Sequence, residues 1–291
     1  MMKRADAPLT VIVTSYQSPV VLEKCLTSLC AQKEVSQIVV ADCSQLNPGD
    51  AIQSRFPLVT FLYWDRPLIV PAMRWAALEQ VQSDLVGAVE ARTIPQPDWA
   101  QRIVEAHAAH PECPAVGGPV ALAEPSSAFE RGLYLCEYGA YTPPLPEGFT
   151  NELAGANLSY KRVALIKEQD LLTAGKWETL LHLRWKQQGK ALWMSQAMIE
   201  FENTMTPWAA MQQRFFYGRG YAANRFGQRS LGYALIALLL PCLLTWRMAQ
   251  GKNKKLLSAA TLGWLLTLNS AWALGEAVGY ATGNAGEPRI F

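Results

Sequence analysis

The sequence has few of the residues that stabilise disulfide-rich folds or build metal clusters. Its six cysteines are scattered without a Cys-x-x-Cys pair, and it contains only three histidines. This pattern argues against a disulfide framework and against a cysteine-based metal cluster, and it favours a reducing compartment. Such crosslinks are not needed, because 291 residues, half of them hydrophobic, can bury a large core.

An excess of one charge is also missing. Lys and Arg outnumber Asp and Glu by 26 to 24, which gives a net charge of +2. Nucleic-acid-binding domains normally present a strongly basic face, so nucleic acid is not an expected partner. The basic start MMKRADAPLTVIV is followed by only a brief apolar run before Ser15, and no secretory signal peptide is expected there.

The first two-thirds of the chain alternate between short apolar runs and amphipathic segments. The expected strands are residues 9–13, 37–41, 59–63, 85–89 and 115–122, and the expected helices are residues 20–31, 71–82 and a segment after Trp99. Helical segments between consecutive strands imply right-handed crossovers and a mainly parallel sheet. Residues 123–150, rich in proline and aromatic side chains, are expected to form a loop.

The composition changes after about Tyr217. Residues 231–246 and 256–275 are nearly continuous apolar runs, joined by a linker with Arg247 and three lysines. At about 1.5 Å per residue these runs span roughly 24 Å and 30 Å, against a hydrocarbon core of about 30 Å. Only the second run is comfortably long enough to cross a bilayer.

The positions of the positively charged residues indicate whether these two apolar runs would span a membrane or lie in its surface. Cations precede the first run and fill the linker, so a spanning hairpin would place one cluster on the wrong side. A re-entrant or interfacial hairpin keeps both clusters on the cytoplasmic face. We therefore expect an α/β domain at residues 1–221 and a membrane-associated helical region at residues 222–291. Two buried helices in a soluble domain are the alternative, although the runs lack a polar stripe.

The stretch LVGAVEARTIPQPDW, residues 85–99, carries the clearest chemical signal. An apolar run with strand character ends at Glu90 and continues through a proline-rich turn into a helical segment. In open α/β sheets, ligands bind where strands end, so charged residues at this exit are candidates for a site. Glu90 and Arg92 are two residues apart and project from the same face of an extended backbone.

This stretch and six others resemble the family-two glycosyltransferases of the GT-A type, in the expected order from about residue 9 to residue 221. The six are TVIVTSYQSPVVLEKCLTSL, VVADCS, PAMRWAALEQVQSD, LAGANLSYKR, GKWETLLHLRWKQQGK and MQQRFFYGRGYAANRF. The resemblance implies a GT-A nucleotide-sugar transferase fold with a mainly parallel sheet, followed here by a C-terminal apolar helical hairpin. It also implies a nucleotide-sugar donor, with uridine as the expected nucleotide.

The resemblance assigns donor-side roles to residues of the first four motifs. It implies contacts to the base from the backbone near Thr14 and Tyr16, and to the uracil or ribose from Asp42. Arg74 matches the arginine of the family's "A-R-N-x-G" helix. The family's Asp-x-Asp triplet, which holds the diphosphate and its metal, reads Glu90-Ala91-Arg92 here.

The altered triplet leaves several readings open. Arg92 is expected to supply fixed positive charge where other members recruit Mg²⁺ or Mn²⁺. Alternatively, Glu90 alone holds the metal, because Mg²⁺ often binds through one or two carboxylates and substrate phosphates. A third interpretation makes Glu90 and Arg92 an ordinary surface ion pair.

The remaining motifs imply an acceptor side and a catalytic base. Gly155 and Asn157 match the "G-A-N" acceptor segment, and Gln213 and Arg214 are expected to reach the acceptor. Glu178 matches the catalytic aspartate that draws the proton from the acceptor hydroxyl, a role that contributes about 10²–10⁴-fold to the rate. The alternative for Glu178 is a glutamate that only favours the start of its helix.

The leading hypothesis is an inverting glycosyltransferase on the cytoplasmic face of a membrane, in a bacterium the inner membrane. It would transfer a sugar from a nucleotide-sugar to a lipid-linked or polysaccharide acceptor. The second hypothesis is a catalytically inactive transferase-fold protein that binds nucleotide sugar or scaffolds polysaccharide assembly. A Glu178 side chain directed into the site favours the enzyme, and one directed to solvent favours the binding protein.

Overall fold

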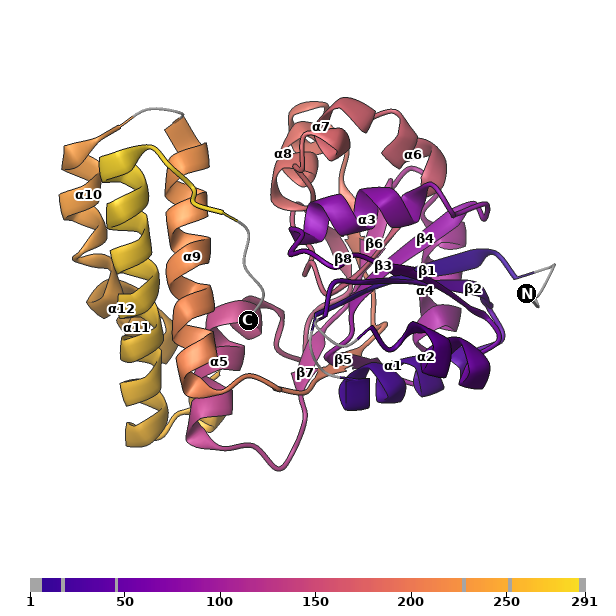
Figure 1. Cartoon of the computed structure of the whole chain (residues 1–291), viewed down its shortest axis with the longest axis horizontal. Helices are drawn as coiled ribbons and strands as arrows, with labels where there is room; N and C mark the ends of the chain where they lie inside the picture. Colours follow the sequence, from indigo (N-terminus) through magenta and orange to yellow (C-terminus); the bar gives the residue numbers. More distant parts are fainter. Residues whose placement is uncertain (1–6, 17–18, 45–46, 227–228, 251–252, 288–291) are drawn as a thin grey trace. The chain divides into compact units, whose positions relative to one another are not determined.

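The computed structural model describes residues 7–16, 19–44, 47–226, 229–250 and 253–287. The described chain forms two compact units (Figure 1). We call residues up to 121 and 141–202 the α/β unit, and residues 122–140 and 203–287 the helical unit. The predicted boundary at residue 221 is wrong as a structural division, because it falls inside one continuous helix, α9 (Pro207–Phe226).

The α/β unit contains an eight-stranded sheet with the strand order β3-β2-β1-β4-β9-β6-β10-β8. The strands are β1 (Leu9–Ser15), β2 (Val35–Asp42), β3 (Val59–Tyr63), β4 (Leu85–Glu90), β6 (Ala115–Gly117), β8 (Gly148–Thr150), β9 (Asn157–Lys161) and β10 (Leu192–Met194). β1 pairs in parallel with β2 and β4, β2 with β3, and β6 with β10. β8 and β9 run antiparallel to their neighbours. The expected mainly parallel sheet is present, with two reversed strands.

Burial explains the composition of the central strands. All seven residues of β1, LTVIVTS, are buried. A strand covered on both faces needs a continuous apolar run rather than an alternating pattern. The chain also forms a second, three-stranded sheet. Its strand order is β5 (Thr93–Pro95), β11 (Ile199–Phe201) and β7 (Val120–Leu122). The single strand expected at 115–122 is divided into β6 and β7 at Gly118, where a side chain would overlap the carbonyl of Ala197.

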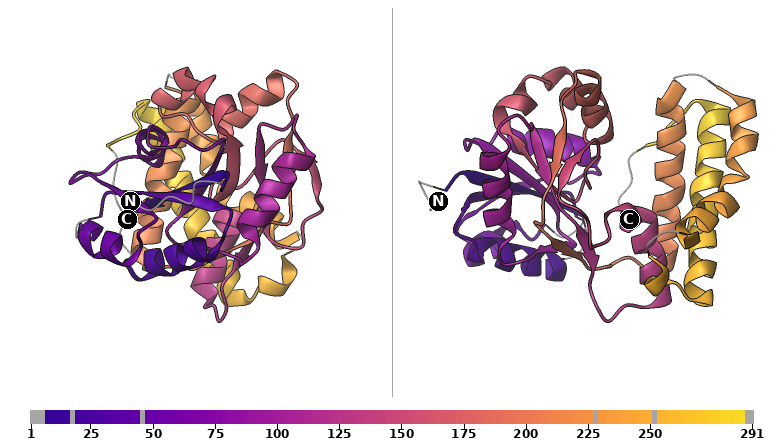
Figure 2. Two further views of the ribbon diagram at one scale, coloured as in Figure 1. Left: turned by 90° about the vertical axis from the view of Figure 1, so that its right-hand side faces the viewer. Right: turned by 180° about the vertical axis from the view of Figure 1, so that it is seen from behind.

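Helices cover both faces of the main sheet. They are α1 (Pro19–Ala31), α2 (Gly49–Arg55), α3 (Val70–Leu78), α4 (Trp99–Ala109), α6 (Arg162–Ile166), α7 (Gln169–Thr173) and α8 (Thr179–Gln187). Within this unit, α1 and α2 lie on one face of the sheet and α3, α7 and α8 on the other (Figures 1 and 2). The helix expected at residues 20–31 is confirmed as α1, and its apolar residues form the buried face. The helix expected at 71–82 ends earlier, at Leu78.

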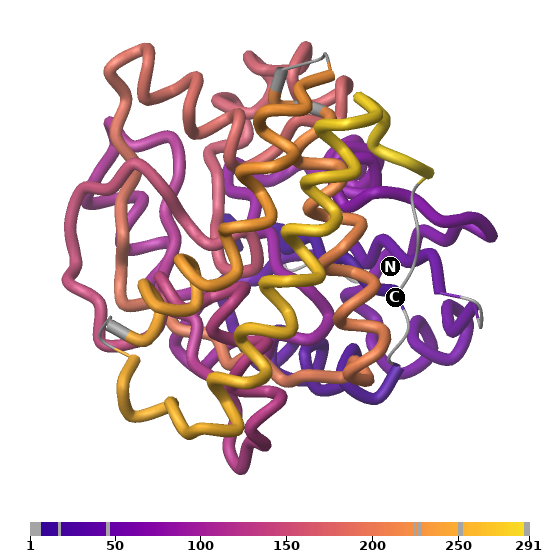
Figure 3. Tube along the Cα trace, turned by 90° about the vertical axis from the view of Figure 1, so that its left-hand side faces the viewer, coloured from indigo at the N-terminus to yellow at the C-terminus, as the bar shows by residue number. Residues whose placement is uncertain are grey.

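The helical unit consists mainly of five helices, α5 (Ala128–Tyr138), α9, α10 (Leu231–Ala237), α11 (Leu240–Gln250) and α12 (Ala259–Thr282). α5 occupies part of the segment expected as a loop, and it packs on α12. α9 and α12 run side by side (Figure 3). Their backbones come close at small residues, because a side chain at Gly218, Gly275 or Gly279 would overlap a carbonyl of the facing helix.

The apolar run at 231–246 does not form one helix. It is divided into α10 and α11, which are bent by 44°. Pro241 lacks an N–H group and its ring clashes with the carbonyl four residues earlier, that of Ala237, where α10 ends. Within the described part of the chain, no single helix has the length and hydropathy to cross a membrane, α12 included, and only the bent pair α10–α11 meets both conditions jointly.

Candidate functional site

The carboxyl ends of three strands meet at one edge of the main sheet. β1 lies between β2 and β4, with Ser15 in register with Asp42 and Thr14 in register with Glu90. The chain leaves β1 for β2 on one side, and β4 lies on the other side. This arrangement is a topological switch point, where open α/β sheets bind their ligands. Four residues predicted from the sequence are thus brought to one edge: Thr14, Tyr16, Asp42 and Glu90.

Asp42 ends β2 with an incompletely satisfied carboxylate. Its side chain is buried, and its Oδ1 accepts hydrogen bonds from the Ser44 backbone N–H at 2.9 Å and from Ser44 Oγ at 2.6 Å. Its Oδ2 is buried, and no described residue donates to it. A buried acceptor without a partner costs about 1–3 kcal/mol. A hydroxyl or N–H group of a ligand at the sheet edge would remove that cost.

Thr14 and Tyr16 contribute mainly through the shape of the loop after β1. Thr14 is buried, its hydroxyl donates to the carbonyl of Val89 at 3.5 Å, and its own carbonyl accepts from the Ala91 N–H at 2.9 Å. Tyr16 is half-buried and packs against the hydrophobic core. The next two residues of the loop lie outside the described chain.

Glu90 and Arg92 form an ion pair at the end of β4. Arg92 Nε donates to Glu90 Oε2 at 2.9 Å, and the two side chains are only 17% and 23% exposed. The guanidinium carbon of Arg92 lies 5.0 Å from the centre of the Phe201 ring, at a distance typical of a cation–π contact. Glu90 and Arg92 do form an ion pair, as the third interpretation of the triplet states. They do not form an ordinary surface pair, because both side chains are largely shielded from solvent.

The described side chains near this edge form no metal site of three or more protein ligands. Among the described residues, no group of three or more His, Cys, Asp and Glu side chains is placed to hold a metal ion. The carboxylate of Glu90 already accepts from Arg92. A cation held here by three protein side chains is therefore not supported, whereas the prediction that Glu90 alone binds a metal together with phosphates stays a prediction.

A second cluster joins three more of the predicted residues. Arg74 on α3 is fully buried, donates from Nη2 to the carbonyl of Gly155 at 2.7 Å, and forms an ion pair with Glu178. A side chain at Gly155 would lie 3.4 Å from Cδ of Glu178, so the glycine faces this carboxylate directly. Arg74 is predicted to lie on the donor side of the site. In the structure it contacts Glu178, the predicted catalytic base, and Gly155, which is predicted to face the acceptor.

The backbone of Glu178 is unusual. Its φ angle is 37°, which places a non-glycine residue in the left-handed region. It immediately precedes α8, yet its side chain accepts no hydrogen bond from that helix. The alternative that Glu178 only favours the start of its helix does not match its contacts. The carboxylate is directed to Arg74 and Gly155 instead of the N–H groups of α8. The side chain is 23% exposed, so part of it reaches solvent.

The two clusters are connected through the core. Cys43, which follows Asp42, lies with its Sγ 3.8 Å from Sδ of Met73, the residue before Arg74. Trp177, the residue before Glu178, is buried in the same hydrophobic cluster as Cys43 and Met73. Trp177 thus packs in the core, and it holds the segment that carries Glu178 against it.

The Asn157 side chain, predicted to contact the acceptor, lies inside the protein in this structure. Its side chain is completely buried, its Oδ1 accepts from Trp99 Nε1 at 2.8 Å, and its Nδ2 donates to the carbonyls of Pro119 and Ala197, both at 2.8 Å. Both N–H groups of the amide and one acceptor position of its oxygen hold β9 against neighbouring segments. The remaining predicted acceptor residues, Gln213 and Arg214, belong to α9 in the helical unit, where both are buried.

A buried histidine supports the start of α8. His182 Nε2 lies 3.2 Å from the hydroxyl of Tyr160, and the His182 N–H donates to the carbonyl of Glu178 at 2.7 Å. Burial lowers the pKa of His182 to about 4 and raises the pKa of Tyr160. The imidazole is therefore neutral near pH 7 and adds no positive charge beside the Arg74–Glu178 pair.

Two further residues contribute to this site. Ser44 fixes the Asp42 carboxylate, and the Asp-x-Ser spacing, typical of a turn closed by an Asp side chain, could have indicated it. Phe201 of β11 packs against the Arg92 guanidinium. The two residues are far apart in the sequence, so no local sequence pattern predicts this contact.

One protein-family model matches the part of the chain that contains the three strand ends. The model of the family described as "Glycosyl transferase family 2" matches residues 10–133. This region includes Thr14, Asp42, Arg74, Glu90 and Arg92, and it ends before Gly155 and Glu178. The chain is thus similar to that family over the segment that contains the three strand ends.

Among solved structures, Staphylococcus aureus TarS 1–349 in complex with UDP-GlcNAc is similar, with a TM-score of 0.47 and 15% sequence identity. The match covers 74% of this chain, and it spans 65% of the TarS chain. No protein of curated function matches the chain.

Proposed function

We propose that the protein is a nucleotide-sugar glycosyltransferase of the GT-A type that acts with inversion. The observation that carries the proposal is the alignment of Asp42, Thr14 and Glu90 at one sheet edge, inside the region similar to glycosyl transferase family 2. A switch point with polar strand ends is where a nucleotide would bind in such a sheet. The Arg74–Glu178–Gly155 cluster supplies a carboxylate for the chemical step.

Asp42 is the residue we assign to the nucleotide, with the unpartnered Oδ2 accepting from the ribose or the base. Titration calorimetry with UDP tests this. Asp42→Ala should weaken UDP binding about tenfold or more, because a hydrogen bond to a charged group is lost. Asp50→Ala, on the exposed side of α2 after the same strand, is the matched control and should bind as the native chain does. Equal affinity of all three proteins would remove Asp42 from the site.

In the proposed reaction, Glu178 takes the proton from the acceptor hydroxyl as that oxygen attacks the anomeric carbon. Arg74 positions the Glu178 carboxylate, and Gly155 leaves room beside it. As the bond to the nucleotide breaks, negative charge grows on the leaving diphosphate. Arg92 is the cation at the strand exit that we assign to this charge. Its pairing with Glu90 fixes the guanidinium in place without a metal ion.

One observation favours the second function, a transferase-fold protein that binds nucleotide sugar without transfer. Both carboxylates suited to chemistry, Glu90 and Glu178, are paired with arginines. A carboxylate that already accepts from a guanidinium is a weaker proton acceptor. In this reading Asp42 still binds nucleotide, while Glu178 only holds Arg74 in place.

A screen of nucleotide sugars separates the two functions. The native chain and Glu178→Gln are incubated with each donor, with and without EDTA, and nucleotide release is measured. Turnover that persists in EDTA and is lost in Glu178→Gln supports the metal-independent transferase. Turnover abolished by EDTA and restored by Mn²⁺ would overturn the role of Arg92. UDP binding without turnover on any donor would support the binding protein.

The acceptor and location are part of the same proposal. We assign the protein to the cytoplasmic face of a membrane, in a bacterium the inner membrane, with a lipid-linked or polysaccharide acceptor. The support is the set of exposed leucines along α10 and α11 and between them, with Arg229 before α10 and Arg247 on α11. Exposed apolar surface flanked by cations suits an anionic lipid interface.

A further inference from the structure

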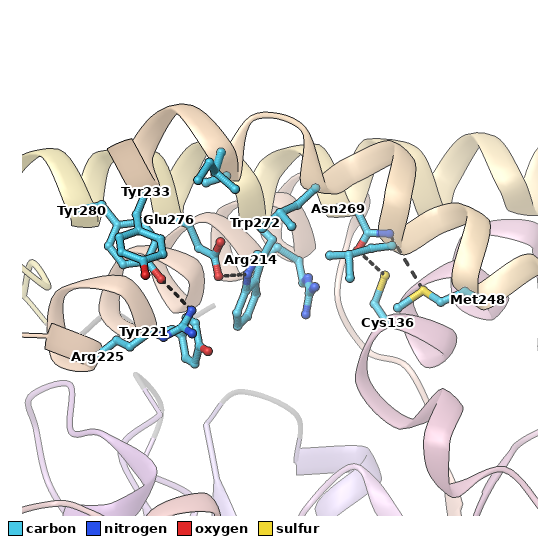
Figure 4. A pocket seen from close by; sticks show the side chains of 14 residues that line it. Cys136, Arg214, Tyr221, Arg225, Tyr233, Met248, Asn269, Trp272, Glu276 and Tyr280 are labelled. Atoms are coloured by element: carbon cyan, nitrogen blue, oxygen red, sulfur yellow. Dashed lines mark hydrogen bonds between the residues drawn. The ribbon is translucent and has the colours of Figure 1, made fainter. Parts of the chain in front are cut away.

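The helical unit contains a cavity that the proposed transfer reaction does not use. Its volume is about 480 Å³, and residues of α5, α9, α10, α11 and α12 line it (Figure 4). Three of the lining residues, Tyr221, Tyr233 and Ile236, are exposed, so the cavity opens to the surface. Its volume falls in the range of pockets that hold small molecules.

One part of the wall is apolar. It is formed by Ala237 of α10 and by Leu240, Leu244 and Met248 of α11. The bend before Pro241 turns α11 relative to α10, and both helices contribute side chains to the cavity. A wall of aliphatic and thioether groups suits a hydrocarbon chain, and each buried methylene strengthens binding roughly fourfold.

The other part of the wall carries a buried cation. Arg214 is only 8% exposed, and its guanidinium carbon lies 4.4 Å from the centre of the Trp272 ring. Figure 4 shows this pair in the middle of the lining residues. The Nε of Arg214 is buried, and no described residue accepts a hydrogen bond from it. A buried donor on a charged group is costly unless an acceptor reaches it.

The remaining charges do not supply that acceptor. Glu276 accepts from Trp272 Nε1 at 3.0 Å, and within the described chain it forms no ion pair with Arg214. Arg225 adds a second positive charge to the lining and donates to the Tyr280 hydroxyl at 3.2 Å. Two arginines against one carboxylate leave the charged part of the cavity complementary to an anion.

We propose that this cavity binds an amphiphile with one hydrocarbon chain and an anionic headgroup. The headgroup accepts from Arg214, and the chain lies against Leu240, Leu244 and Met248. The combination of a buried Arg214 Nε that no described residue accepts from with an aliphatic wall distinguishes this ligand from a free anion and from a neutral apolar molecule. The proposal does not depend on the transferase function.

The test is titration calorimetry on the full chain in detergent-free buffer, with octyl phosphate below its aggregation concentration. Octanol carries the same chain without charge, and inorganic phosphate carries the headgroup chemistry without a chain. We expect octyl phosphate to bind at least about tenfold more tightly than either. Affinity for octyl phosphate equal to that for inorganic phosphate, or equal to that for octanol, overturns the proposal, as does the absence of binding.

Two pairs of variants locate the site. Arg214→Gln should weaken octyl phosphate about tenfold and leave octanol unchanged, whereas Arg247→Gln, exposed on α11 and outside the cavity, should change neither. Leu244→Trp fills the apolar part and should abolish binding of the alkyl chain. Leu243→Trp, the neighbouring exposed position, should retain it.

Circular dichroism melting of each variant shows whether it is folded. Arg214 is buried, so Arg214→Gln could be destabilised. In that case the comparison of Leu243→Trp with Leu244→Trp decides, because both substitutions add the same side-chain volume. Equal loss of octyl phosphate binding in Leu243→Trp and Leu244→Trp would place the ligand elsewhere and overturn the proposal.

Discussion

Glu178 combines three features at one residue. Its backbone has a positive φ angle, its carboxylate pairs with the buried Arg74, and it leaves its own helix without a side-chain cap. A non-glycine residue in a sparsely populated conformation costs about 1–3 kcal/mol and persists only where its surroundings impose it. Here the buried Trp177 and the ion pair impose it, and together they hold the carboxylate beside Gly155.

If Glu178 is the general base, Glu178→Gln should lower turnover by about 10²-fold or more while UDP binding stays nearly unchanged. Glutamine keeps an oxygen that can accept from Arg74, but it cannot take a proton from the acceptor. Steady-state kinetics and UDP titration on the same preparation measure both quantities. Glu79→Gln, exposed at the end of α3, serves as the control and should keep native turnover. Normal turnover in Glu178→Gln would mean that the base lies elsewhere.

His182 should make the stability of the fold depend on pH. Burial lowers its pKa from 6.5 to about 4 in the folded chain. Between these values the unfolded chain binds a proton at this residue and the folded chain does not, so stability falls as the pH drops from 6.5 to 4. The loss approaches about 3 kcal/mol, since one pKa unit corresponds to 1.36 kcal/mol.

Urea unfolding of the native chain and of His182→Gln at several pH values isolates this contribution. The difference between their unfolding free energies should be constant above about pH 7 and should shift in favour of the variant toward pH 4. A difference that does not change over this range would show that His182 is protonated equally in both states.

At the level of single residues, the sequence allowed the positions of site residues to be predicted better than their contacts. Asp42 and Glu90 could be placed at strand ends because apolar runs end there. The burial of Asn157 could not be foreseen, since its three partners come from distant segments. The direction of the Glu178 side chain depends on a backbone angle that no local pattern encodes.

Among the helices, the contact between α9 and α12 depends on glycine. A side chain at Gly275 would overlap the carbonyl of Phe215, whereas Gly263 of the same helix has nothing within 4 Å of an added Cβ. Gly275→Ala should therefore destabilise the protein by about 1–3 kcal/mol, as expected for overpacking. Gly263→Ala should stabilise it by up to about 1 kcal/mol, because alanine favours the helix.

Thermal or urea unfolding of the two variants gives the comparison directly. The substitution is chemically the same in both, so opposite signs can only come from the surroundings of each glycine. A stabilised Gly275→Ala would contradict the close contact between the two helices.

Helices and strands with a clear local sequence pattern could be predicted from the sequence. The helix α5 and the break between α10 and α11 were not predicted, although each has a local cause. The core strands and α1 show buried runs and a helical stripe. α5 was expected as a loop, yet Ser127 and Glu130 form a capping box at its start, a pattern readable in the sequence. The break between α10 and α11 likewise follows from Pro241.

For the whole molecule, the division into units could not be predicted from composition alone. Residues 122–140 leave the α/β unit to join the helical unit, and the chain then returns. The family match, which ends at residue 133, extends into this inserted segment. Apolar composition indicated a helical region after residue 221, but the contacts of α9 and α5 extend the helical unit to earlier segments.

The exposed apolar surface of the bent pair α10–α11 provides the last prediction. Leu231 and Leu235 of α10 are 71% and 69% exposed, and Leu239, at the bend between the two helices, is 74% exposed. Transfer of each leucine into a lipid interface contributes up to about 1.5–3 kcal/mol, whereas each nearby cation contributes about 1 kcal/mol on an anionic surface. High salt screens only the second contribution, so binding to anionic vesicles should survive 1 M salt, a concentration at which the Debye length is about 3 Å.

Vesicle sedimentation measures this, and two variants separate the apolar contribution from nonspecific adhesion. Leu235→Ser with Leu239→Ser should release the protein from vesicles in high salt, because the apolar contribution is then also reduced. Val163→Ser, at an exposed apolar position on α6 in the α/β unit, should remain bound like the native chain. Release of the native chain by salt alone would show that charge carries the attachment, and the α10–α11 leucines would then need another explanation for their exposure.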